Sequence, residues 1–208
     1  KVMGLASYGD PSRYREVLSE ALPLTEEGFR APDWAFRWAP FRLELSPALL
    51  ARLGPARAGE AALVAHDQDL AAALQERTEA IGLHLARTAL RLAGSTRLAL
   101  AGGVALNCVM NGRIAREAGA EELYVQPASS DAGVALGAAA WVWHQVLGHP
   151  RSFQLERADW GPEFADEEIE ALLRAGGLRW RRASDLTAEV ADLLAAGKVV
   201  GWFQGRAE

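Results

Sequence analysis

The sequence has one cysteine, Cys108, among 208 residues. This excludes an intramolecular disulfide and fits a reducing compartment. Lysine is almost as scarce, because Lys1 and Lys198 are the only lysines in an otherwise all-arginine set of basic residues. An excess of basic charge is also lacking: the formal net charge is −5, which argues against a broad nucleic-acid interface. We therefore expect no nucleic-acid partner.

The sequence also lacks an apolar run long enough to span a membrane. The longest candidate, 134–147, is too short and carries His144 and Gln145. We therefore expect no membrane partner and a cytoplasmic location. Hydrophobic residues make up 50% of the chain, which is enough for a sizeable core.

Several familiar chemical motifs are absent. Neither the dinucleotide pattern GxGxxG nor the phosphate loop GxxxxGK[ST] occurs, and no His cluster or Ser-His-Asp arrangement can be argued. We interpret His66 and His84 as surface or cap residues, and Cys108 as a small buried hydrophobe. Any metal site would therefore need ligands from outside this sequence.

What the sequence does contain is two strand–turn–helix units between Leu98 and Ala140. Each unit has an apolar strand, a turn of small residues and a helix: 96–101, 102–103 and 107–118 in the first, and 123–126, 128–130 and 132–147 in the second. This order predicts an α/β sheet covered on both faces, with its ligand at the carboxyl ends of the strands. Backbone N–H groups and helix N-termini at such turns suit phosphate oxygens.

The region before these units predicts mainly helices. Asp10 and Pro11 predict the start of a helix that runs to about Leu22. A leucine-rich stripe within 61–93 predicts one long helix across the sheet, ended by Gly94; the stripe residues are Leu63, Leu70, Leu74, Ile81, Leu85 and Leu92. Segments 29–31 and 34–38 predict a short hairpin. The aromatic residues Trp34, Phe36, Trp38 and Phe41 are interpreted as packing, with a substrate wall as the alternative.

Residues 149–162 have the composition of a linker. Beyond them a second α/β unit is expected to begin, with helices at 166–176 and 184–196, the latter capped by Ser184, and strands at 178–182 and 198–203. The chain opens on KVMGLASYG without an initiator Met and stops after VVGWFQGRAE, so we expect it to be a piece of a longer protein.

Two readings stay open for the residues at the strand ends. Gly102 and Gly103 serve either a tight turn or close approach of a ligand. Asn107 is either a helix N-cap or a polar reader of a nucleotide. Asp131 is either an N-cap carboxylate or a carboxylate of a metal or phosphate site.

Four segments together carry a resemblance: KVMGLASYG, AGGVALNCVMNGRI, QPASSDAGVALGAA and GKVVGWFQGR. In this order they resemble the O-carbamoyltransferases of the nodulation-protein-U and cephamycin/tobramycin antibiotic-tailoring type. The resemblance implies that 1–148 is the second half of an actin-like ATPase (ribonuclease H-like) domain. It also implies that 163–208 begins a YrdC-like domain, similar to the enzyme that makes threonylcarbamoyl-adenylate.

The resemblance also implies a reaction and a set of roles. Carbamoyl phosphate and ATP would give carbamoyl-adenylate, and the carbamoyl group would pass to a hydroxyl of a small-molecule or sugar acceptor. A bound iron, or another divalent or trivalent metal, would hold the adenylate. The implied nucleotide-binding residues are Lys1, Gly4, Gly102, Gly103, Asn107 and Gly133; the implied metal ligand is Asp131, and the implied carbamoyl-phosphate ligand is Arg206.

The sequence departs from the family pattern at Ser7, at Ser129 and Ser130, and at Ala207, none of which is a proposed ligand. The family's metal-binding histidines and its catalytic base lie outside this sequence, so we expect the isolated chain to be inactive and its full-length parent active. The alternatives are a sugar-kinase-like ATPase, a tRNA threonylcarbamoyl-transfer protein, and a non-catalytic interaction module. A homodimer stays open.

Overall fold

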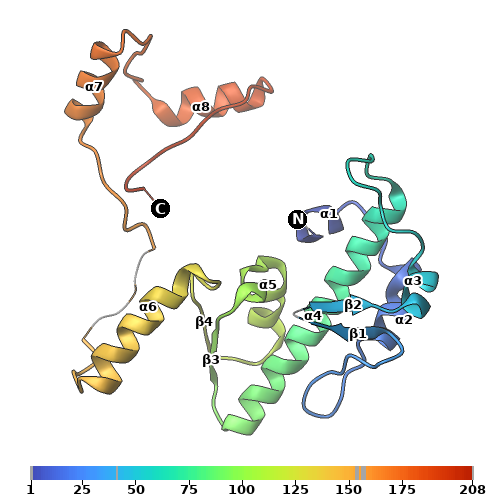
Figure 1. Ribbon diagram of the computed structural model, residues 1–208. Helices are drawn as coiled ribbons and strands as arrows, with labels where there is room; N and C mark the ends of the chain where they lie inside the picture. The colour runs from blue at the N-terminus through green and yellow to red at the C-terminus, as the bar shows by residue number, and fades with distance from the viewer. Residues whose placement is uncertain (1, 41, 153–154, 156–157, 208) are drawn as a thin grey trace. The chain divides into compact units, whose positions relative to one another are not determined.

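The computed structural model describes residues 2–40, 42–152, 155 and 158–207. The chain divides into two compact units, Lys1–His149 and Pro150–Glu208 (Figure 1). Within the described residues, no helix combines the length and the apolar character needed to cross a membrane.

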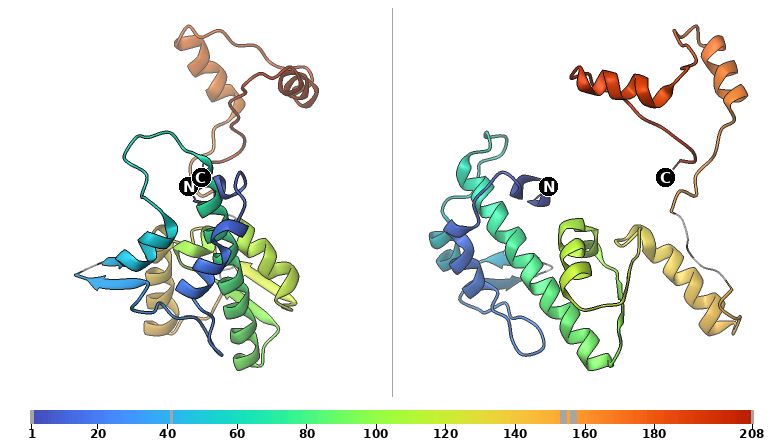
Figure 2. Two further views of the ribbon diagram at one scale, coloured as in Figure 1. Left: turned by 90° about the vertical axis from the view of Figure 1, so that its right-hand side faces the viewer. Right: turned by 180° about the vertical axis from the view of Figure 1, so that it is seen from behind.

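Helix α4 (Ala65–Ala93) is the centre of the first unit. Helices α1 (Val2–Ala6), α2 (Ser12–Ala21) and α5 (Cys108–Glu117) all pack against it. The two views of Figure 2 show α2 and α5 beside different parts of α4. The long predicted helix is therefore confirmed, but it starts at Ala65, so Leu63 precedes it.

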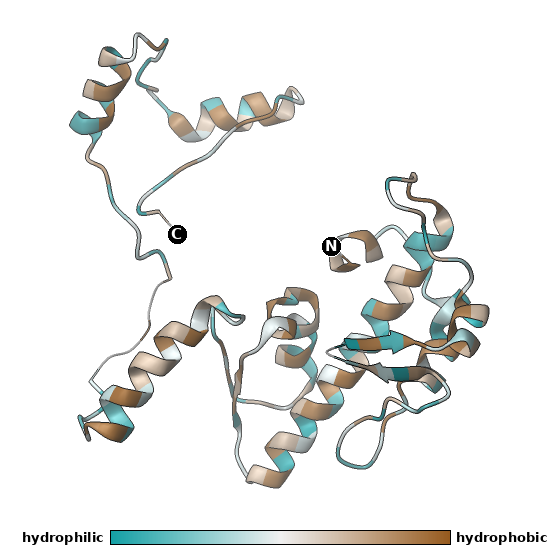
Figure 3. Cartoon of the chain, viewed as in Figure 1, coloured by the Kyte–Doolittle hydropathy of each residue, from teal (hydrophilic) through white to brown (hydrophobic). Residues whose placement is uncertain are grey.

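The buried face of α4 differs from the predicted leucine stripe. Leu85 and Leu92 are exposed, and Figure 3 shows polar and apolar residues alternating along the helix. The side chains that are buried instead are mostly small: Ala71, Ala72, Ala73, Gln75, Leu83, Ala86 and Thr88. Because alanine allows close approach of neighbouring helices, α4 is packed by helices along this face. Gly94 ends it in the left-handed conformation, as predicted.

Two apolar clusters make up the core of this unit. The first lies between α2, α3 (Pro47–Leu53) and α4: Tyr14, Leu18, Ala21, Ala35, Leu49, Leu53 and Ala73. The second joins α4 to α5 through Ala86, Met110 and Ile114. Gly82 admits Met110 to this interface, because a Cβ at position 82 would lie 2.5 Å from Met110 Sδ. The second cluster supports the strands that follow α4.

The start of α2 agrees with the sequence only in part. Pro11 occupies the N-cap position, and Asp10 Oδ1 accepts a hydrogen bond from the Ser12 N–H at 2.9 Å. Hydrogen bonds from Ser12 hold the pKa of Asp10 below its ordinary value. Asp10 therefore serves the first turn from one position further out than expected.

The predicted hairpin is wrong. The strands are β1 (Phe36–Ala39) and β2 (Arg42–Leu45), while Phe29 pairs only with Leu24 in an isolated bridge. Phe36 packs against the first core cluster, but Trp38 is 80% exposed, so the aromatic residues do not act as one packing group. Phe41 lies outside the described residues.

The two histidines of α4 are not plain surface residues. His66 Nδ1 lies 2.6 Å from the hydroxyl of Tyr14, and the two rings meet edge to face. His84 Nε2 is buried without a hydrogen-bond partner among the described residues. The contact of His66 with α2 was not predicted, because the helical period alone does not reveal a partner 52 positions away.

We expect Tyr14→Phe to lower the free energy of unfolding by about 1 kcal/mol, the net contribution of one hydrogen bond. The ring would stay in the core while the bond to His66 is lost. Urea denaturation measures the change. Tyr8→Phe is the matched control, because Tyr8 is 75% exposed; equal effects of the two substitutions would contradict the assignment.

The second unit contains α7 (Asp166–Ala175) and α8 (Leu186–Ala195). Asp185, rather than Ser184, caps α8, since its Oδ1 accepts from the Ala188 N–H at 3.0 Å. The predicted strands at 178–182 and 198–203 are wrong: neither is a strand in the described part of this unit. A strand forms only against a partner backbone, and none pairs with these segments there.

Candidate functional site

The two strand–turn–helix units form as the sequence predicts. Strands β3 (Arg97–Leu100) and β4 (Glu122–Val125) are parallel and lead into α5 and α6 (Ala132–Trp141). The register pairs Arg97 with Glu122, Leu98 with Leu123, Ala99 with Tyr124, and Leu100 with Val125. Helix α6 continues as a π-helical segment, Val142–Val146.

One expectation about the strands is wrong. Both alternate between exposed and half-buried residues, whereas a sheet covered on both faces was expected. Leu98, Leu100 and Leu123 face the second core cluster, while Arg97 and Ala99 face away from it. Helix α6 is apolar on all sides, yet none of its residues is buried (Figure 3).

A hydrogen bond joins the two turns at the carboxyl ends of the strands. The Gly102 N–H donates to the Ser129 carbonyl at 2.7 Å, directly beyond the strand bond from the Gln126 N–H to the Leu100 carbonyl at 3.1 Å. Ser129 is buried, and its hydroxyl donates to the Gln126 carbonyl. The prediction that Gly102 and Asp131 lie at one edge of one sheet is thereby confirmed.

The glycine turn has backbone geometry that only glycine adopts easily. Gly102 has φ +99°, and the short 3₁₀ turn η1 (Gly103–Leu106) follows it. A Cβ built on Gly102 or Gly103 would meet no atom within 4 Å among the described residues. The space in front of the turn is therefore open, which fits close approach of a ligand to the backbone.

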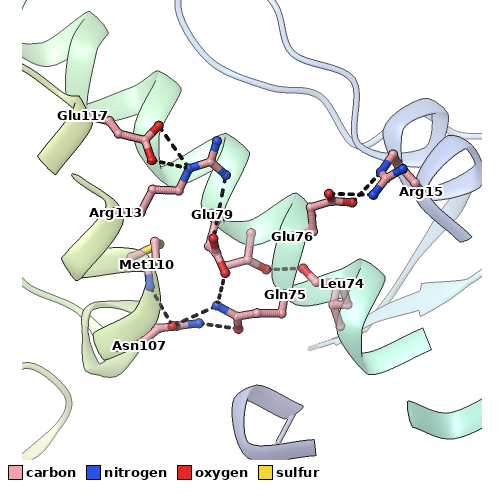
Figure 4. A network of polar contacts seen from close by, with 10 residues as sticks. Arg15, Leu74, Gln75, Glu76, Glu79, Asn107, Met110, Arg113 and Glu117 are labelled. Carbon is pink, nitrogen blue, oxygen red and sulfur yellow. Dashed lines mark hydrogen bonds and ion pairs between the residues drawn. The ribbon is translucent and has the colours of Figure 1, made fainter. Parts of the chain in front are cut away.

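The side chains of Asn107 and Asn111 form hydrogen bonds next to this turn. Asn107 Oδ1 accepts from the Met110 N–H at 3.1 Å, so the predicted cap of α5 is confirmed. Asn111 Nδ2 donates to the Ala105 carbonyl at 2.7 Å. The amide of Asn107 also pairs with Gln75 of α4 (Figure 4). The role of Gln75 was not predicted from the sequence, because no local pattern indicates a contact between residues 32 positions apart.

The structure separates the two readings of Asp131. Its side chain makes no capping hydrogen bond to α6, and its backbone is already helical, with φ −53° and ψ −31°. Asp131 therefore occupies the N-cap position, as predicted, but its exposed carboxylate does not cap the helix, and its role as a ligand stays a prediction. Gly133 has a packing role, since a Cβ there would lie 2.1 Å from the Ala128 carbonyl oxygen.

The remaining predicted residues lie in different places. Gly4 is an exposed residue of α1, where a Cβ would meet no described atom within 4 Å. Met3 Sδ lies 3.8 Å from Cys108 Sγ, which brings α1 next to the start of α5. Cys108 is exposed, so its interpretation as a buried hydrophobe is wrong. Lys1 lies outside the described residues. Arg206 belongs to the second unit, where it pairs with Glu163 at 3.4 Å.

The residues present do not by themselves fit a metal ion. No group of three or more His, Cys, Asp or Glu side chains that could hold one occurs among the residues that the structure describes. Asp131 would supply one ligand, and a transition metal needs several. A metal at Asp131 would therefore require ligands from beyond these residues.

A parallel strand pair with two small-residue turns joined at its carboxyl edge defines an α/β protein. The family model described as "Carbamoyltransferase N-terminus" matches residues 1–140. The chain belongs to this family, which confirms the resemblance carried by the motifs.

The relatives agree with this assignment. The chain is 41% identical to an uncharacterised protein of Synechocystis and 40% identical to the nodulation protein NolO of Bradyrhizobium diazoefficiens, in both cases over its whole length. It spans 35% and 37% of those two proteins. A 3'-hydroxymethylcephem-O-carbamoyltransferase of Streptomyces clavuligerus is 33% identical over 66% of the chain and 25% of its own length.

Proposed function

We propose that the full-length protein is an O-carbamoyltransferase. Carbamoyl phosphate is hydrolysed to carbamate and phosphate, and a carbamate oxygen then bonds to the α-phosphorus of ATP while pyrophosphate leaves, which gives carbamoyl-adenylate. The carbamoyl group is then transferred to a hydroxyl of a small-molecule or sugar acceptor. Family membership supports carbamoyl transfer, and the cephem O-carbamoyltransferase among the relatives supports a hydroxyl acceptor. On this proposal, residues 1–148 belong to an actin-like domain and 163–208 begin a YrdC-like domain.

The observation that carries the proposal is the hydrogen bond from Gly102 to Ser129. It places the glycine turn and the loop that leads to Asp131 side by side at one sheet edge. Phosphate oxygens can approach Gly103 closely because it has no side chain, and they can meet the N–H groups at the start of α5 and α6. Gly4 of α1, together with Lys1, would complete the nucleotide site.

In the transfer step, the acceptor hydroxyl oxygen bonds to the carbamoyl carbon, and the bond from that carbon to the adenylate oxygen breaks. AMP leaves with the negative charge, and the hydroxyl proton passes to a base outside the described residues. Asp131, with further ligands, would hold a metal that offsets the charge of the adenylate. In the second unit, the guanidinium of Arg206 would release Glu163 and bind the phosphate group of carbamoyl phosphate.

The test is product analysis with the full-length protein, ATP and carbamoyl phosphate. We expect pyrophosphate to be released only when carbamoyl phosphate is present, with carbamoyl-adenylate detected by mass spectrometry. AMP should follow when an acceptor is added or the adenylate is hydrolysed. Inorganic phosphate in place of carbamoyl phosphate is the control. Formation of ADP upon addition of sugars, with no AMP, would overturn the proposal and identify a kinase.

A further inference from the structure

A buried amide pair links α4 to the glycine turn. Gln75 is 7% exposed, and its Nε2 donates to Asn107 Oδ1 at 3.1 Å. In return, Asn107 Nδ2 donates to Gln75 Oε1 at 2.8 Å. Figure 4 shows the two side chains facing each other between α4 and α5. Such a two-way pair could be built with both amides reversed, so something else must set its direction.

The two ends of the pair set that direction. Glu79 Oε1 lies 2.9 Å from Gln75 Nε2, and an ionised carboxylate only accepts hydrogen bonds. Gln75 must therefore turn its NH₂ group toward Glu79. At the other end, the Met110 N–H only donates, so Asn107 must turn its oxygen toward α5. Both ends require the same arrangement.

Arginine holds the acidic end of this chain of contacts in place. Arg113 of α5 lies 3.7 Å from Glu79 and 3.2 Å from Glu117. The Glu79 side chain is 18% exposed, so the ion pair is partly shielded from solvent. Arg113 thereby keeps the carboxylate next to Gln75.

The hydrogen bonds of the amide pair use every donor except one N–H of Asn107 among the described residues. The oxygen of Asn107 accepts from Gln75 and from Met110, and one of its two N–H groups donates to Gln75. Both N–H groups of Gln75 are used, by Asn107 and by Glu79. Among the residues that the structure describes, one N–H of Asn107 therefore has no acceptor, and this half-buried residue directly follows η1.

We propose that Gln75 is a positioning residue, directed by Glu79, that makes Asn107 offer an N–H donor at the glycine turn. The ligand atom must then be an acceptor, which a nucleotide supplies as a phosphate oxygen, a ribose oxygen or a ring nitrogen. This inference rests on the proposed function, because it takes ATP as the ligand. Gln75 itself touches no reacting atom.

The test exchanges the amide and the carboxylate of positions 75 and 79, which leaves the sizes of the side chains and the net charge unchanged. In Gln75→Glu, the new carboxylate faces Glu79 and Asn107 Oδ1, both acceptors, and the variant is expected to lose stability. The double variant Gln75→Glu with Glu79→Gln restores a hydrogen bond between positions 75 and 79. It leaves no N–H at position 75 to donate to Asn107 Oδ1 and puts a carboxylate oxygen there instead. The Asn107 amide is then no longer held in one orientation, and the Met110 N–H loses its acceptor whenever that amide turns.

We expect the double variant of the full-length protein to bind ATP about 10-fold more weakly, since the N–H donor of Asn107 is no longer held toward the ligand. It should also melt somewhat below the wild type, because Glu79 no longer pairs with Arg113. Glu76→Gln is the matched control: Glu76 lies on the same helix, and its partner is Arg15 at 2.8 Å, outside the amide pair. It should bind ATP like the wild type. A double variant with wild-type ATP affinity would overturn the proposal.

Hydrogen exchange of the Met110 backbone amide is a second measurement, and it needs no nucleotide. If the wild type binds no ATP, the proposed function fails, and the positioning role is judged by exchange alone. Exchange that is faster in the double variant than in Glu76→Gln supports control of Asn107 by Gln75, because the Met110 N–H has lost its acceptor. Equal exchange rates contradict it.

Discussion

Asp131→Asn in the full-length protein is expected to remove most carbamoyl transfer while leaving the fold intact. Since the carboxylate makes no capping bond to α6, its loss should change the free energy of unfolding by less than about 1 kcal/mol, the usual contribution of a cap. A neutral amide is a poor ligand for a hard cation. Activity should therefore fall by about 100-fold or more, because even loss of a residue that only hydrogen-bonds to a metal ligand lowers activity by about 10- to 100-fold. The amount of bound metal should fall as well.

Metal analysis by mass spectrometry and a transfer assay measure these two effects. The matched control is Asp185→Asn, because Asp185 does cap its helix, with Oδ1 accepting from the Ala188 N–H. That control should keep its metal and its activity. Alanine substitutions should affect stability in the opposite order. Asp185→Ala should lower the free energy of unfolding by about 1 kcal/mol, and Asp131→Ala should change it little. Full metal content and activity in Asp131→Asn would show that the site assignment is wrong.

Gly133→Ala is expected to damage the same loop through packing. The added Cβ would lie 2.1 Å from the Ala128 carbonyl oxygen, so either the start of α6 or residues 128–130 must move. Forced shifts of this kind cost about 1–3 kcal/mol. The shift would also move the Ser129 carbonyl away from the Gly102 N–H. We therefore expect lower stability together with weaker ATP binding.

The same helix offers the control for this substitution. A Cβ on Gly137 would meet no described atom within 4 Å, so Gly137→Ala should gain up to about 1 kcal/mol from helix propensity. Thermal unfolding and ATP titration of both variants make the comparison. If the two alanines behave alike, the close approach of α6 to Ala128 is not a constraint on the folded protein.

Much of the candidate site could be predicted from the sequence because its signals are local. Glycine at a strand end, asparagine before a helix and small residues before Asp131 each act within a few positions. The strand pair, the cap by Asn107 and the shared edge of Gly102 and Asp131 are confirmed for this reason. The nucleotide, metal and carbamoyl-phosphate roles of these residues stay predictions, because they depend on ligands and on chain beyond the described residues.

The sequence alone determined where α2, α4, α7, α8 and the two strand–turn–helix units lie, because capping and turn geometry depend on near neighbours; it did not predict α1 or α3. Only the tertiary structure decided which face of α4 is buried, which residue holds Asn107 and whether Asp131 caps its helix. Gln75 lies 32 positions from Asn107 and meets it only because α4 packs on α5 through Ala86, Met110 and Ile114. The amide pair therefore depends on helix packing, which brings distant residues within hydrogen-bonding distance and leaves no local mark in the sequence.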